Sequence, residues 1–127
     1  MKTSELMLDF LKKQGFLPEV EEHGISFNYQ MKTFIYWIHD DDNEFFQLTL
    51  PGIFKANEAN LDAVLRATNY VNSHLKVVKA NVMNEEIVWL FFEILLDSNP
   101  ALEEIVPRAL NALLGAQNIF YQKISEG

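Results

Sequence analysis

The residues most able to do chemistry lie in one short polar segment, from His39 to Glu44. Its acidic side chains alternate in the manner of the oxygen ligands of a calcium-binding loop. However, Phe45 stands where such a loop requires glycine, and Pro51 stands where it requires a carboxylate that binds through both oxygens. We therefore favour a solvated hairpin loop with no metal. The imidazole of His39 beside the carboxylates keeps a small-ligand or metal site at this loop as the alternative.

No other part of the chain has the spacing of a catalytic site. The five glycines form neither a phosphate-binding loop nor a dinucleotide fingerprint, and no serine lies in a nucleophile elbow. Carboxylates occur as sequence neighbours, at Glu21–Glu22, Glu85–Glu86 and Glu103–Glu104, near expected turns or helix starts where charges are ordinarily solvated. We predict a protein that is not an enzyme and carries no cofactor.

The charge balance restricts the partners. A formal net charge of -8 and a pI near 4.7 disfavour nucleic acid and anionic membranes, because both are bound by basic surfaces. The absence of cysteine excludes disulfides and thiolate chemistry. The N-terminal segment, with Asp9 in an amphipathic pattern, is unlike a signal peptide. We expect one cytoplasmic domain spanning residues 1–127.

Apolar spacing then predicts the elements. Helical spacing is found over residues 4–14 and 58–75 and in a tail that starts at Asn99–Pro100, with Pro107 expected to kink or split the tail. Alternating or continuous apolar segments predict strands over 16–22, 25–29, 33–39, 46–50, 78–82 and 87–96. Thr3 or Ser4 is expected to cap the first helix, Asn57 the second, and Pro51–Gly52 to form a turn. The order predicts a two-layer α+β fold, an antiparallel sheet of five to six strands with helices on one face.

The most apolar strand, residues 87–96, is apolar on both faces apart from Glu93. A two-residue loop before it would direct Glu93 into the core, whereas a three-residue loop, 84–86, would pair Ala80 with Leu90 and keep Glu93 outside. Burying an unpaired carboxylate costs several kcal/mol. We therefore choose the three-residue loop, which places Glu93 opposite Val77 and diagonal to Lys79, within reach of an ion pair.

This register leaves a second apolar face away from the helices. Ile87, Trp89, Phe91 and Glu93 lie on it, and the apolar segment 33–39 adds Trp37. Leaving such side chains in water forgoes about 1.5 to 3 kcal/mol each, and monomers rarely expose so large a patch. We expect these five residues to form a partner or dimer surface.

Three segments together are similar to a known family. The segments Ile25–Tyr29, Phe46–Phe54 and Ala67–Asn72, with the Leu-Pro strand end and the helix asparagines, resemble YbjN-like proteins and the wider type III secretion chaperone-like fold. The resemblance implies a small acidic α+β homodimer that binds other polypeptides without ATP or metal. Secretion chaperones hold an extended client segment in apolar grooves. We therefore expect a non-enzymatic protein-binding module, chaperone-like or regulatory, or alternatively a structural subunit of a larger assembly.

Overall fold

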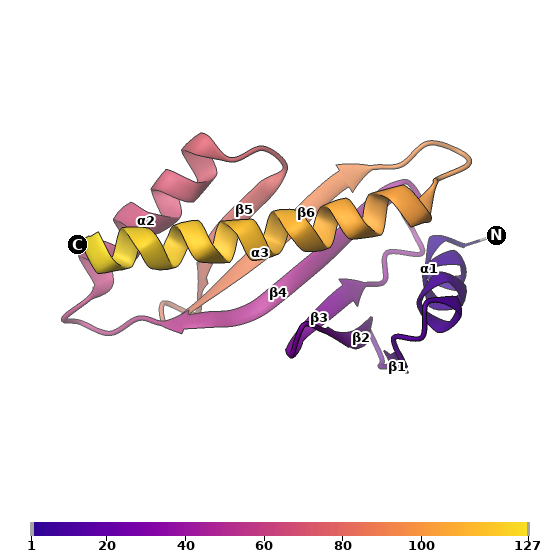
Figure 1. The fold of residues 1–127 in the computed structure, drawn as a ribbon, viewed down its shortest axis with the longest axis horizontal. Coiled ribbons are helices and arrows are strands. Elements are labelled where there is room, and N and C mark those ends of the chain that lie inside the picture. Colours follow the sequence, from indigo (N-terminus) through magenta and orange to yellow (C-terminus); the bar gives the residue numbers. More distant parts are fainter. Residues whose placement is uncertain (1, 127) are drawn as a thin grey trace.

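The computed structural model describes residues 2–126 as three helices and a six-stranded antiparallel sheet (Figure 1). The elements are α1 (Thr3–Lys13), β1 (Glu19–Val20), β2 (Gly24–Tyr29), β3 (Lys32–Trp37), β4 (Phe45–Lys55), α2 (Leu61–His74), β5 (Val78–Met83), β6 (Ile87–Leu95) and α3 (Leu102–Glu126). The strands lie in the order β1-β2-β3-β4-β6-β5. The α+β class with helices on one face is therefore confirmed.

One buried cluster joins the helices to the inner face of the sheet. Met7 and Leu11 of α1, Val64 of α2 and Leu113 of α3 contribute to it. Figure 1 shows α3 lying along the length of the sheet, with α2 beside it. Because all three helices pack on the inner face, no helix of residues 2–126 lies over the outer face of the sheet. Among the described residues, none of the helices has the length and hydropathy needed to cross a membrane.

The strand pairing confirms the predicted three-residue loop. Ala80 pairs with Leu90, and the even positions Val88 and Leu90 are fully buried on the inner face. Asn84 and Glu85 both have positive φ, and Glu86 N donates to Met83 O at 3.0 Å, which closes a type I′ turn.

The Pro51–Gly52 turn prediction is wrong. β4 continues through both residues to Lys55, and its pairing with β6 shifts between Leu50 and Phe54. The segment is a bulge in which Gly52 adopts a φ of +63°, a conformation that glycine tolerates best. A turn signature and a bulge use the same residue types, so the local pattern could not separate them.

Helix starts also differ from prediction. α1 begins at Thr3 with no side-chain cap of its own, because Asn43 Oδ1 accepts from Thr3 N at 2.6 Å. α2 begins at Leu61, because Asn57 and Asn60 bond each other's backbone N–H and hold the preceding residues in a turn.

Three other elements differ from their predicted extents. The edge strand is only Glu19–Val20, and β3 ends at Trp37. The C-terminal helix begins at Leu102 and is continuous through Pro107. Proline there removes the bond to the carbonyl of residue 103, which lies in the first turn, but the helix continues past it, so the prediction that Pro107 splits the helix is wrong.

Candidate functional site

The outer face of the sheet carries the side chains that the sequence singled out. In the ladder between β4 and β6, Thr49 lies opposite Phe91 and Gln47 opposite Glu93. β3 adds Trp37 from one side, and β5 adds Lys79, which lies opposite Phe91, from the other. The outward-facing residues of four neighbouring strands therefore meet above the centre of the sheet.

Three rings form the outer aromatic cluster, which consists of Trp37, Trp89 and Phe91. Trp37 and Trp89 are stacked with centroids 6.3 Å apart, and Trp89 and Phe91 are stacked at 6.2 Å. Trp37 Nε1 donates to Thr49 Oγ1 at 3.1 Å, and Thr49 Oγ1 donates to Ile35 O at 3.2 Å. This threonine is fully buried, so the outer face has a small packed layer of its own.

Burial within the outer aromatic cluster is uneven. Phe91 is only 8% exposed, with Lys79 Nζ 5.6 Å from the centre of its ring, whereas Trp37 and Trp89 are partly exposed. Ile87 at one end of β6 and Leu95 at the other are exposed, Leu95 by 74%. The tryptophans and the two aliphatic residues are thus the accessible apolar part of the face.

A polar row crosses the same face and consists of His39, Gln47, Glu93 and Lys79. Gln47 Nε2 donates to Glu93 Oε2 at 2.6 Å, and Lys79 Nζ lies 3.0 Å from Glu93 Oε1. Because the amide nitrogen of Gln47 donates to Glu93, its Oε1 accepts from His39 Nε2 at 2.9 Å. The predicted ion pair with Lys79 is confirmed, and the charge of Glu93 is balanced within the face.

The residues of the acidic loop after β3 make hydrogen bonds and an ion pair with the start of the chain. Asp40 accepts a hydrogen bond from Ser4 at 2.8 Å and lies 3.8 Å from Lys2 Nζ. Thr3 Oγ1 donates to Asn43 O at 2.5 Å. Among residues 2–126, His, Asp and Glu side chains form no group of three that could hold a metal ion. The loop holds α1 against the sheet.

Sequence reasoning missed one surface. Leu61 and Leu65 belong to the apolar helical spacing of residues 58–75, which is typical of a buried helix face, yet Leu65 is 48% exposed. Both line a groove between α2 and the β5–β6 hairpin. The stripe in α2 is wider than the sheet beneath it can cover, and only the position of the helix shows which leucine remains in water.

Comparison with known proteins gives a likeness of fold alone. No known protein-family profile matches the chain, and no curated protein matches it in sequence. One similar solved structure is an uncharacterized protein from Methanothermobacter thermautotrophicus, with 12% identity, a TM-score of 0.67, and coverage of 98% of this chain and 97% of the other. Another is YbjN from E. coli, described as a candidate transcription regulator, with 6% identity, a TM-score of 0.70, and coverage of 96% and 91%. The YbjN-like fold is thereby confirmed.

Proposed function

We propose that this protein is a non-enzymatic protein-binding module that forms a homodimer through the outer face of its sheet. The proposal rests on an apolar cluster with balanced charge, on a face that none of the described helices covers. Trp37 and Trp89 supply rigid apolar area, and the pairing of Glu93 with Lys79 avoids an unpaired charge in an interface.

A second copy suits this face for an electrostatic reason. The chain as a whole carries a net charge of -8, so two copies repel each other through most surfaces. On the outer face, Glu93 is paired with Lys79, and Glu86 at the rim is paired with Lys55 at 3.3 Å. The face is locally neutral, which makes it suitable for contact between two acidic molecules.

A regulatory role of the kind named for YbjN, if it extends to this chain, would act through protein contact. The composition lacks the basic stripe that binds a phosphate backbone. Chaperone-like or regulatory binding of a partner polypeptide fits the same surface chemistry.

The test is the mass in solution by light scattering across protein concentrations. We expect a particle of twice the 14.7 kDa chain mass. Leu95→Lys should weaken the association at least about tenfold, because a symmetric interface brings two new charges into an apolar contact. Met31→Lys is the matched control, since Met31 is fully exposed at the β2–β3 turn, away from the outer aromatic cluster.

Two outcomes would contradict the homodimer. One is a wild-type chain that remains monomeric at high concentration. The other is a dimer that Leu95→Lys and Trp89→Ala leave unchanged while both variants retain their fold by circular dichroism.

A further inference from the structure

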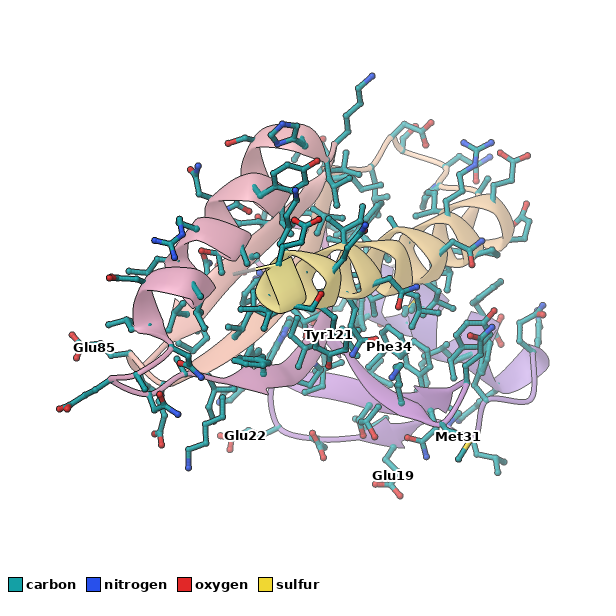
Figure 2. The ribbon with its side chains drawn as sticks, turned by 60° about the vertical axis from the view of Figure 1, so that its left-hand side comes forward. Glu19, Glu22, Met31, Phe34, Glu85 and Tyr121 are labelled. Carbon is teal, nitrogen blue, oxygen red and sulfur yellow. The ribbon has the colours of Figure 1, made fainter. Side chains whose placement is uncertain are left out.

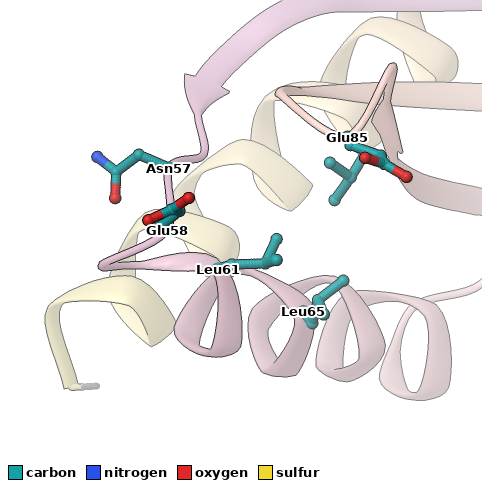
Figure 3. Close-up of a pocket in the computed structure, with 6 residues that line it drawn as sticks. Asn57, Glu58, Leu61, Leu65 and Glu85 are labelled. Atoms are coloured by element: carbon teal, nitrogen blue, oxygen red, sulfur yellow. The ribbon is translucent and has the colours of Figure 1, made fainter.

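A groove of about 610 Å³ lies between the start of α2 and the β5–β6 hairpin (Figure 3). Its lining consists of Asn57, Glu58, Leu61, Leu65, Val82 and Glu85. Val82 pairs with Val88, which is buried on the inner face, so Val82 faces the helix side of the sheet. The groove is therefore separate from the outer aromatic cluster.

The floor of the groove is apolar and accessible. Leu61 and Leu65 are four residues apart on α2 and lie one turn above the other, while Val82 approaches from β5. Leu65 is about half exposed and Val82 is partly exposed. Such a floor gains free energy by covering an aliphatic side chain.

The rim carries two carboxylates from different elements. Figure 3 shows Glu58 before α2 and Glu85 on the hairpin turn, with the two leucines between them. Neither glutamate forms an ion pair with any residue from 2 to 126, whereas the neighbouring Glu86 is paired with Lys55. The negative charge at this rim is uncompensated, and it favours a cation beside the apolar group.

The edge of β5 offers backbone groups at the same place. The side-chain amide of Asn72 bonds both backbone groups of Ala80, accepting from its N–H at 2.6 Å and donating to its C=O at 3.0 Å. These groups of Ala80 therefore point away from β6. Val82, two residues further on, directs its N–H and C=O the same way, whereas the side-chain oxygen and nitrogen of Asn72 both bond Ala80. An extended peptide could pair with the strand edge at Val82.

We propose that this groove binds an extended polypeptide segment in which basic residues flank an aliphatic side chain. The aliphatic group occupies the floor formed by Leu61, Leu65 and Val82, and the cations lie against Glu58 and Glu85. A second copy of this chain is disfavoured as the occupant, because it would bring a net charge of -8 to an acidic rim. The inference rests on the proposed function for the class of ligand, and it does not require the homodimer.

The turn that carries Glu85 offers a test of the assignment. Its second central position has φ of +60° and is ordinarily occupied by glycine in a type I′ turn. Keeping glutamate there weakens the hairpin and retains a carboxylate at the groove. The shorter β2–β3 turn also has two central residues with positive φ, and Met31, at φ +66° in the second of these positions, provides a control.

The experiment titrates the full-length ¹⁵N-labelled protein with the blocked peptide Lys-Leu-Lys-Leu-Lys, with Glu-Leu-Glu-Leu-Glu, and with hexylammonium. We expect the lysine peptide to bind more tightly than the glutamate peptide or hexylammonium, with changes in amide chemical shift centred on residues 58–65 and 82–85. Glu85→Gln should weaken it about two- to fivefold, as loss of one partly solvated ion pair does, and Glu21→Gln should leave it unchanged.

Three results would overturn the proposal. These are equal binding of the two peptides, equal weakening by Glu85→Gln and Glu21→Gln, and equal binding of hexylammonium, which would assign the groove to small apolar cations. Glu85→Gly gives an independent readout. It should raise the midpoint temperature of thermal unfolding by about 2 to 6 °C and weaken binding of the lysine peptide. Met31→Gly should raise the midpoint and leave binding unchanged. Figure 2 shows Met31 and Glu85 on opposite sides of the molecule.

Failure of this inference and failure of the homodimer are distinguishable. Leu95→Lys lies on the outer face and should bind the lysine peptide as the wild type does, whatever its oligomeric state. Loss of peptide binding in Leu95→Lys would contradict the groove assignment, because Leu95 lies at the opposite end of β6 from the hairpin turn.

Discussion

At the scale of single residues, Glu93 is the one charged side chain within an apolar strand, and Lys79 is its ion-pair partner. Their side chains are 25% and 49% exposed, so solvent screening limits what the pair contributes. A double-mutant cycle with Lys79→Ala and Glu93→Ala should give a coupling free energy of about 0.5 to 1 kcal/mol by urea unfolding. The same cycle between Lys13 and Asp9, an exposed pair on α1, is the comparison and should give less. Coupling that is no larger than in the α1 pair would contradict a structural role for the polar row.

Tyr36 sets a pH dependence at the alkaline end. Burial, followed by the charge of Asp40, raises the pKa of Tyr36 from 10.0 to about 12. The unfolded chain therefore loses this proton first, and the stabilisation, complete below pH 10, is lost as pH rises to 12. The unfolding free energy of the wild type, measured relative to that of Tyr36→Phe, should fall by about 2 to 3 kcal/mol across that range. A difference that does not change with pH would contradict it, and comparison with the variant removes the effect of lysine ionisation.

At the scale of elements, α1 depends on a cap supplied from forty residues away. Asn43 accepts from Thr3 through its side chain and through its backbone carbonyl, so it holds both the helix start and the loop. Asn43→Ala should lower the unfolding free energy by about 1 kcal/mol, and protection of the α1 amides from hydrogen exchange should fall. Asp41→Ala, an exposed change in the same loop, is the control. Equal loss in both variants would show that the cap contributes nothing.

The strand pairing was predictable because a single charge decided it. Glu93 would lie in the core in one register and outside in the other, and the energetic difference of several kcal/mol is larger than any competing local preference. The cap on α1 could not be found in the same way. Thr3 and Ser4 both satisfy the local preference for a cap, and only the folded chain brings Asn43 to that position.

Of the two candidate sites, one could be predicted from the sequence and the other could not. Trp37, Trp89 and Glu93 could be assigned to the outer face because strand alternation has a period of two and the register follows from it. The groove beside α2 could not, because helical spacing marks Leu61 and Leu65 as apolar without saying how far the sheet extends below them. Glu85, at the rim of the groove, comes from the turn Asn84-Glu85, which lacks the glycine of the usual Asn-Gly.

At the scale of the whole molecule, the uneven charge distribution should govern association. If two copies meet through a neutral face while each carries a net charge of -8, long-range repulsion opposes the contact. Raising sodium chloride from 0.05 to 0.5 M should therefore lower the dimer dissociation constant at least about threefold, measured by sedimentation equilibrium. Peptide binding at the groove should weaken over the same range, because there the charges attract. A dimer that dissociates with added salt would indicate an interface held by ion pairs.

The bulge in β4 has a consequence for how the chain can change in length. Leu50 and Phe54 are four positions apart on β4, whereas their partners Leu90 and Val88 are two positions apart on β6. The excess is even, so Phe54 returns to the inner face, where its ring packs against Phe120 of α3 with centroids 5.6 Å apart. A single-residue insertion or deletion here would reverse the facing of the strand's last residues, whereas a change of two would preserve it. Relatives of this chain should therefore differ at the bulge in steps of two residues.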